Sequence, residues 1–240
     1  MKRRSSKPDR ICAIVPVNVL RESKARLVKH LDASNRSRLS AAMLMDVLHT
    51  LLSVERISRV TVVSADHGVR RVIRPTRAHF LWEGRRKGLN KGVRLALRDA
   101  KRRQFSAALI VPSDLPLVTP REILRFLRVA DDYSVAVAPS KDGGGTNALF
   151  LRPPGVISPA FGKNSFGKHL SIANRKGLSV KVVKSAGIAL DIDEPEDLVS
   201  LNGLFLKNQT GRFLSNINRT LFVNWQPNQS LIGRHLRRRI

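Results

Sequence analysis

The chain has few of the residues that would place it in several common protein classes. Its 240 residues include one cysteine, Cys12, which excludes an internal disulfide and fits a reducing compartment, so we expect a cytoplasmic protein. With one tyrosine and two tryptophans, a base-stacking platform for nucleic acid is not expected. No apolar run approaches the ~20 residues that a membrane helix needs, so we expect no membrane partner.

Acidic residues are also scarce, with 18 Asp and Glu against 44 Lys and Arg and a formal net charge of +26. Such a surplus suits nucleic acid, an anionic surface or anionic small substrates such as nucleotides. Basic residues gather in a tail over residues 1–10 and in an extension over residues 207–240 that has no acidic residue. We therefore expect one domain over residues 11–206 and a partly disordered basic extension. A basic nucleic-acid-binding protein stays open as an alternative.

Short apolar runs alternate with amphipathic helical patterns along the domain. The basic start followed by residues 11–20 resembles a signal peptide, but Pro16 and Asn18 interrupt it, and a buried strand explains it better. Strands are expected at 11–17, 57–64, 78–82, 107–112, 133–138, 148–151, 178–183 and 187–192, and helices at 39–51, 89–100, from 120 and at 165–177. This order predicts an α/β fold, a three-layer sandwich around a mixed, mostly parallel sheet.

A glycine-rich loop over residues 142–147 is the most distinctive stretch. Three glycines let the backbone approach a ligand and turn its N–H groups inward, which suits a phosphate or a carboxylate. Gly145 within it is a candidate substrate-binding residue. The loop is neither a P-loop nor a dinucleotide fingerprint, since no Gly-Lys-Ser/Thr follows and a strand comes after it. A plain hairpin turn is the alternative.

Three carboxylates lie at or just after the ends of predicted strands. Asp114 comes just after the strand at 107–112, and strand alternation would put Asp191 and Asp193 on one side of the strand at 187–192. Together they would bind one or two Mg²⁺ ions at a phosphate. The alternative is that residues 193–197 are only the acidic start of a helix.

Cationic and polar groups lie at other predicted element ends. Lys24 and Arg26 belong to a loop after the first strand, where open α/β sheets hold nucleotides, although a solvated charge run is equally compatible. Ser165 fits a helix N-cap that could hold an anion. Asn90 could read a base or ribose edge, or only cap its own helix. We interpret His169 as structural.

Strands alternating with helices, an Asp at a strand tip and a late Asp-x-Asp are typical of nucleotidyltransferases of the nucleotide-diphospho-sugar-transferase kind. Several stretches resemble the 2-phospho-L-lactate guanylyltransferase family more closely. They are Val15-Pro16-Val17 with Ser23-Lys24-Ala25-Arg26-Leu27; Asp114-Leu115-Pro116; Gly144-Gly145-Thr146-Asn147-Ala148-Leu149 followed by Arg152-Pro153-Pro154; Phe161-Gly162 with Ser165-Phe166 and His169-Leu170; and Asp191-Ile192-Asp193 with Pro195-Glu196-Asp197-Leu198. The first two are shared with other nucleotidyltransferases, including molybdenum-cofactor guanylyltransferases. The resemblance covers residues 11–205.

The resemblance implies a reaction in which GTP and a phosphorylated hydroxy-acid give a guanylylated acid and pyrophosphate, for synthesis of a deazaflavin coenzyme. Phospho-L-lactate, phosphoenolpyruvate and 3-phosphoglycerate are the acceptors that it allows. A nucleotidyltransferase that uses a sugar phosphate or molybdopterin stays open. The sequence sets no oligomeric state, and a homodimer also stays open.

The resemblance also implies roles for individual residues. The phosphate of the acceptor would be held at Thr146, Gly162 and Ser165, and GTP phosphates at Lys24 and Arg26. Metal-binding carboxylates would be Asp114, Asp191 and Asp193. One departure is Asn18, where the family commonly has Lys, so a cation near the triphosphate is missing unless Lys24 or Arg21 replaces it.

Overall fold

The computed structural model describes residues 9–85, 88–201 and 207–218, and in these ranges seven strands form one sheet in the order β3-β2-β1-β4-β6-β5-β7. The strands are β1 (Ile11–Pro16), β2 (Ile57–Ser64), β3 (His79–Trp82), β4 (Ala107–Ile110), β5 (Val135–Pro139), β6 (Thr146–Leu151) and β7 (Val180–Val182). Only β6 runs antiparallel to its neighbours, β4 and β5, and the other pairs are parallel. The predicted mixed, mostly parallel sheet is confirmed.

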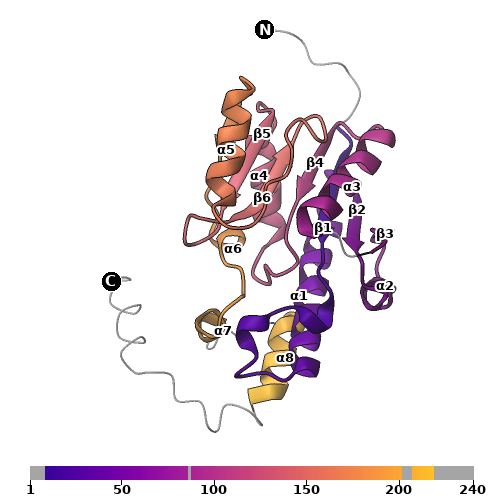
Figure 1. Cartoon of the computed structure of the whole chain (residues 1–240), viewed down its shortest axis with the longest axis vertical. Helices are drawn as coiled ribbons and strands as arrows, with labels where there is room; N and C mark the ends of the chain where they lie inside the picture. The colour runs from indigo at the N-terminus through magenta and orange to yellow at the C-terminus, as the bar shows by residue number, and fades with distance from the viewer. Residues whose placement is uncertain (1–8, 86–87, 202–206, 219–240) are drawn as a thin grey trace.

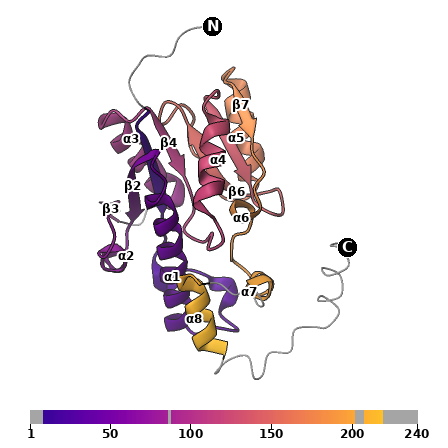
Figure 2. The ribbon, with the colours of Figure 1, turned by 180° about the vertical axis from the view of Figure 1, so that it is seen from behind.

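Helices cover both faces of the sheet, because the central strands are apolar without alternation and need partners on both sides. On one face lie α1 (Ala33–Leu52), α2 (His67–Ile73), α4 (Pro120–Ala130) and the short α6 (Ala186–Ala189). On the other lie α3 (Leu89–Arg102) and α5 (Ser165–Arg175). Figure 1 shows α3 and α5 in front of the sheet. In Figure 2, which views the molecule from the opposite side, α1 and α4 lie in front of the sheet. These are the three layers predicted.

The connection after β1 contains two short 3₁₀ turns, Leu20–Glu22 and Ala25–Leu27, instead of an open polar loop. Its apolar residue Leu27 is fully buried, in a cluster with Leu39 of α1 and Ile192. The loop is thereby packed against the segment that carries the late aspartates. No helix in the described ranges is long and apolar enough to cross a membrane.

Helix α4 begins with the predicted capping box. Thr119 accepts from the backbone N–H of Glu122, and Glu122 Oε2 accepts from the backbone N–H of Thr119 at 3.0 Å. The other oxygen of Glu122 accepts from the N–H of Gly187 at 2.7 Å, in α6. The start of α4 therefore also fixes the segment that precedes Asp191.

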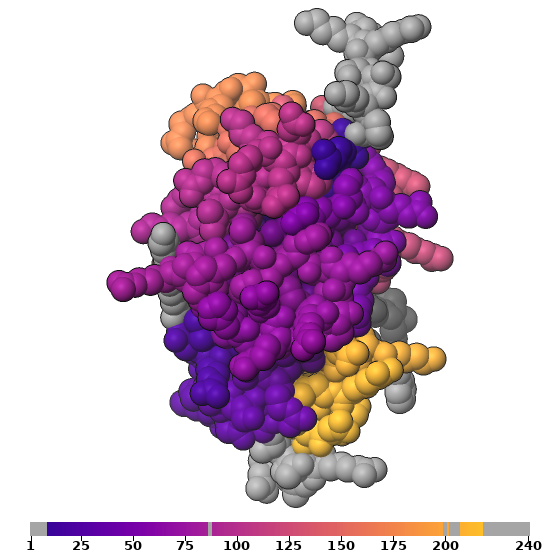
Figure 3. Space-filling model, turned by 90° about the vertical axis from the view of Figure 1, so that its right-hand side faces the viewer, coloured from indigo at the N-terminus to yellow at the C-terminus, as the bar shows by residue number. Residues whose placement is uncertain are grey.

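A C-terminal helix, α8 (Gln209–Asn218), packs on α1, and Figure 3 shows it in yellow at the lower end of the molecule. Phe213 and Ile217 are buried in the cluster that contains Leu39. The carboxylate of Asp46 accepts from the first N–H groups of α8, those of Gln209 at 2.8 Å and Thr210 at 2.9 Å. The predicted boundary at 206 is therefore wrong for this helix, and residues 219–240 of the predicted extension lie outside the described residues.

Candidate active site

A cavity of about 410 Å³ opens at the ends of β1 and β4 and beside the start of β6. Segments far apart in the sequence meet there, because parallel strands put their following loops at one edge of the sheet. Most of the predicted site residues line this cavity: Lys24, Asp114, Gly145, Thr146, Gly162, Ser165, Asp191 and Asp193. Asn18, the departure from the family pattern, lines it as well.

Lys24 links the two groups of carboxylates. Its Nζ atom donates to Asp114 Oδ2 and to Asp193 Oδ1, each at 2.7 Å, and its side chain is 6% exposed. Burial opposes the charged form, but the two carboxylates outweigh it, so the pKa of Lys24 stands above its ordinary value. The lysine is a buried, charged cation in the wall of the cavity.

Asp191 lies in the same negative cluster. The side-chain amide of Asn147 donates to Asp191 Oδ1 and to the carbonyl of Ala189, both at 3.1 Å. Burial raises the pKa of Asp191, and the nearby charges of Asp114 and Asp193 raise it further, against the hydrogen bond from Asn147. The three predicted carboxylates therefore do share one site.

The strand predicted at 187–192, on which we based the alignment of Asp191 with Asp193, does not form. Residues 186–189 are helix α6, and the segment that follows is irregular. Gly187 packs so closely that a Cβ there would lie 2.7 Å from the carbonyl oxygen of Leu117. The N–H of Ile192 then donates to the carbonyl of Asp114 at 3.1 Å. Long-range contacts of this backbone, rather than strand alternation, place the aspartates.

The oxygen-rich donor set fits a divalent cation. In the described ranges, no group of three His, Cys, Asp or Glu side chains is arranged to hold a metal ion, and the ammonium of Lys24 bonds two of the carboxylates. However, Asp114 Oδ1 is buried and has no hydrogen-bond partner among the described residues. A buried carboxylate oxygen without a donor is costly unless a cation approaches it, and carboxylates are what hard divalent ions prefer.

The glycine loop is held by its own side chains. Ser140 Oγ accepts from the N–H of Gly145 at 2.7 Å, and Asp142 Oδ1 accepts from the N–H of Gly144 at 3.0 Å. The prediction that the loop turns its N–H groups toward a ligand is wrong for these two glycines. The loop instead acts as a rigid support for Thr146, which is buried in the cavity wall.

Thr146, Gly162 and Ser165 come together as the resemblance implied. Thr146 Oγ1 lies 3.0 Å from Nδ1 of His169, and Nε2 of this histidine accepts from the N–H of Ala160 at 2.9 Å. His169 is fully buried, and burial lowers its pKa to about 4. The cap of α5 is Asn164, which has a φ of 55°, so Ser165 is the first helical residue instead of the predicted N-cap.

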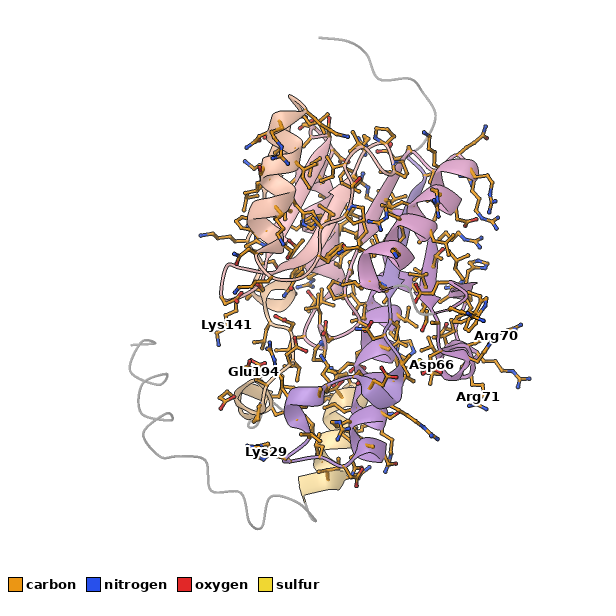
Figure 4. The ribbon with its side chains drawn as sticks, in the orientation of Figure 1. Lys29, Asp66, Arg70, Arg71, Lys141 and Glu194 are labelled. Atoms are coloured by element: carbon orange, nitrogen blue, oxygen red, sulfur yellow. The ribbon has the colours of Figure 1, made fainter. Side chains whose placement is uncertain are left out.

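Two predicted site residues do not line the cavity. Arg26 Nη1 pairs with Glu194 Oε1 at 2.7 Å, and both side chains are at least half exposed. Figure 4 labels Glu194 at the left-hand rim of the molecule, far from Arg70 and Arg71, two cations of the opposite side. The amide of Asn90 bonds both polar backbone atoms of Phe161, at 2.8 and 3.0 Å. In this structure Asn90 therefore fixes the turn before Gly162.

Asn147 and His169 belong to the quoted motifs, but the sequence indicated no part in the site for Asn147 and only a structural role for His169. The signal that could have revealed them is position, because each follows a predicted phosphate-binding residue within the same motif. Asn147 is the neighbour of Thr146 in β6, and His169 is one helical turn after Ser165.

Comparison with known proteins finds matches over most of the chain. A family model described as "Guanylyl transferase CofC like" matches residues 11–234, beyond the end at 205 that the motifs suggested. The chain is 40% identical over 196 residues to the phosphoenolpyruvate guanylyltransferase of Rubrobacter xylanophilus, covering 80% of this chain and 93% of that protein. It is 38% identical over 187 residues to the 2-phospho-L-lactate guanylyltransferase of Methanothermobacter thermautotrophicus, covering 78% and 82%.

Solved structures show the same fold at low sequence identity. A putative nucleotide-diphospho-sugar transferase from Desulfovibrio desulfuricans superposes with a TM-score of 0.74 at 17% identity, over 92% of this chain and 100% of the other. A Mycobacterium tuberculosis protein solved in complex with manganese gives a TM-score of 0.55 at 19% identity, over 81% and 98%. The predicted nucleotide-diphospho-sugar-transferase-like fold is confirmed.

Proposed function

This chain belongs to the CofC-like family of guanylyl transferases, and we propose that it joins GMP from GTP to a phosphorylated hydroxy-acid with release of pyrophosphate. The acceptors we propose are phosphoenolpyruvate, 2-phospho-L-lactate and 3-phosphoglycerate, in the synthesis of a deazaflavin coenzyme. The relatives named above support the first two. The observation that carries the proposal is one cavity that joins three carboxylates and a buried lysine to the hydroxyls of Thr146 and Ser165.

The chemistry needs alignment and charge neutralisation more than a base. A phosphate oxygen of the acceptor attacks the α-phosphorus of GTP, and the bond from this phosphorus to the oxygen bridging to the β-phosphate breaks. Pyrophosphate leaves with that electron pair. Because the attacking phosphate is already ionised near neutral pH, no side chain has to remove a proton. The protein must hold the two anions in line and offset their repulsion.

The acceptor end of the cavity is built from neutral donors. We assign its phosphate to the hydroxyls of Thr146 and Ser165 and to the backbone at Gly162. Thr146 and Ser165 are 4% and 2% exposed, so neither pays much further loss of mobility on binding. Gly162 has a φ of +113°, a backbone shape that a side chain would strain.

The nucleotide end of the cavity is built from charges. Asp114, Asp191 and Asp193 would hold Mg²⁺, which would neutralise the phosphate oxygens at the reacting phosphorus. The unpartnered oxygen of Asp114 supports this assignment, as does the manganese in the mycobacterial structure. With Asp114 and Asp193 bound to the ion, Lys24 would be available for the departing pyrophosphate. Arg26 lies outside the cavity in an ion pair with Glu194, and it would leave that partner to contact the same anion.

The cation that the family commonly has after the Pro-Val pair is absent at Asn18, which lines the cavity. We propose that Lys24 replaces it in binding the triphosphate. A cytoplasmic location suits both these substrates and the single buried cysteine, Cys12.

The test is pyrophosphate release from GTP, ATP and CTP, each with phosphoenolpyruvate, 2-phospho-L-lactate and 3-phosphoglycerate in Mg²⁺ buffer. We expect release with GTP and at least one of the acids, and none without an acid. Release that occurs equally with all three nucleotides would contradict guanylyl transfer. Absence of release with every acid would exclude this class of acceptor, with sugar phosphates and molybdopterin as the next acceptors to try.

A further inference from the structure

His169 stands between two parts of the acceptor pocket. It lies on α5, is fully buried, and uses both ring nitrogens. Nδ1 lies 3.0 Å from Thr146 Oγ1, and Nε2 accepts from the N–H of Ala160 at 2.9 Å. A buried histidine with two fixed partners connects β6 to the turn that carries Gly162.

The partners determine where the ring carries its proton. The backbone N–H of Ala160 can only donate, so Nε2 has to be unprotonated, and a neutral imidazole then carries its proton on Nδ1. That N–H donates to Thr146 Oγ1. The threonine oxygen accepts this bond, and its own hydroxyl proton is left to be donated elsewhere. The cavity that Thr146 lines is where an acceptor for that proton would bind.

The ring stays neutral at physiological pH because burial lowers the pKa of His169 to about 4. A protonated ring would have to donate from Nε2 as well, which the N–H of Ala160 does not allow. Neutrality therefore keeps the direction of both hydrogen bonds fixed.

The Nε2 atom and the ring of His169 hold the turn before Gly162. The ring of Phe161 meets that of His169 edge-on, with centroids 5.0 Å apart at an angle of 71°. Phe161 is also held from the other side by the two hydrogen bonds of Asn90. His169 and Asn90 together therefore set the position of the turn, and only His169 also contacts Thr146.

We propose that His169 is a positioning residue that makes the Thr146 hydroxyl a hydrogen-bond donor to the acceptor's phosphate and sets the spacing between Thr146 and Gly162. It would not touch the substrate itself. The inference rests on the proposed function in placing the acceptor's phosphate at these residues.

Two substitutions separate the effect of the hydrogen bond at Nδ1 from that of the hydrogen bond at Nε2. His169→Gln keeps an acceptor near the position of Nε2 but loses the donor at the δ position, whereas His169→Asn keeps a δ donor and loses the acceptor. We expect His169→Gln to raise KM for the phospho-acid roughly five- to tenfold, the effect of one lost hydrogen bond, and KM for GTP less than about twofold. His169→Asn should raise the phospho-acid KM less. Ser171→Ala, on the exposed face of α5, is the matched control.

A double-mutant cycle tests whether His169 acts through Thr146. In a Thr146→Val background, His169→Gln should add little to the phospho-acid KM, because the hydroxyl that it orients is gone. An undiminished effect in that background, or equal rises in both KM values, would overturn the proposal. Turnover of the wild-type enzyme is measured first, so that failure of the proposed function is seen separately.

NMR of the wild-type protein gives a second test, which remains possible if one of the variants does not fold. Long-range ¹H–¹⁵N spectra of the labelled imidazole rings should show one buried histidine in the neutral Nδ1–H form, at pH 7 and without substrate. Assignment uses the signal that disappears in whichever His169 variant folds. A ring protonated at Nε2 would overturn the direction of both hydrogen bonds and with it the proposal.

Discussion

The Nζ atom of Lys24 lies 2.7 Å from Oδ1 of Asp193, although 169 positions separate them in the chain. The same ammonium donates to Asp114, so one lysine joins carboxylates from two distant segments. A divalent ion bound to these oxygens would compete with the lysine for them. The ion pairs therefore hold the carboxylates of the two segments together, and metal binding would free a cation for the nucleotide.

Replacing the lysine should expose this competition. In Lys24→Met the three carboxylates repel one another, and we expect the free energy of unfolding to fall by roughly 1–3 kcal/mol, below the ~3–5 kcal/mol of a broken, fully buried pair because Asp193 is 46% exposed. Millimolar Mn²⁺ should restore most of it. Chemical unfolding with and without Mn²⁺ measures both effects. The control is Lys29→Met, an exposed lysine labelled in Figure 4. Equal stability of Lys24→Met and wild type in the absence of metal would contradict the account.

Asp114 should be indispensable for turnover and dispensable for folding. Asp114→Asn keeps the shape of the side chain but removes a full negative charge from the metal site, so we expect turnover to fall by about a thousandfold or more. Circular dichroism should show an unchanged fold. Asp132→Asn, on an exposed turn, is the control and should be fully active. Normal activity of Asp114→Asn would refute the metal assignment.

The hydroxyl of Thr146 should matter for the acceptor and not for GTP. Thr146→Val preserves the shape and removes the hydroxyl, so KM for the phospho-acid should rise about tenfold or more, as expected for a lost hydrogen bond to a charged group. Thr146→Ser keeps the hydroxyl and should stay within a few-fold of wild type. Steady-state kinetics with each substrate varied in turn measures the difference. Serine and valine variants that are equally impaired would speak against a hydrogen bond.

His169 should make the fold sensitive to acid. Its pKa is about 4 in the folded protein against 6.5 for the free side chain, so between these values the unfolded chain binds more protons. The contribution of His169 to the free energy of unfolding should therefore decrease by about 3 kcal/mol as pH falls from 6.5 to 4. Above pH 6.5 this contribution should be constant. Urea unfolding across this range, compared between wild type and His169→Gln, isolates the contribution. Parallel pH curves for the two proteins would show that the ring is not held neutral.

The sequence predicted those parts of the fold and site that depend on local pattern. Asp114 follows an apolar strand directly, so its position at the edge of the sheet needed only the strand to be recognised. The capping box at Thr119 and Glu122 is a similar local signal. Both arise from residues near one another in the chain, where hydrophobic period and capping chemistry decide the structure.

Tertiary contacts decided the rest. The apolar residues at 187–192 fit a strand, but Glu122 binds the N–H of Gly187 and the chain forms α6. The role of Lys24 as partner of Asp114 and Asp193 depends on a left-handed backbone at φ 56°, which no local pattern indicates. The helix at 209–218 is short, and its packing depends on Asp46 of α1, which accepts from its first N–H groups.

The central claim is that Asp114, Asp191 and Asp193 converge on one divalent ion beside the phosphate cradle at Thr146. A crystal grown with GTP, a phospho-acid and Mn²⁺ tests it most directly, through the anomalous scattering of manganese. We predict a manganese peak bound by oxygens of these carboxylates, with the ammonium of Lys24 moved to a phosphate oxygen. Manganese bound elsewhere, with Lys24 still paired to Asp114 and Asp193 beside bound nucleotide, would contradict the account.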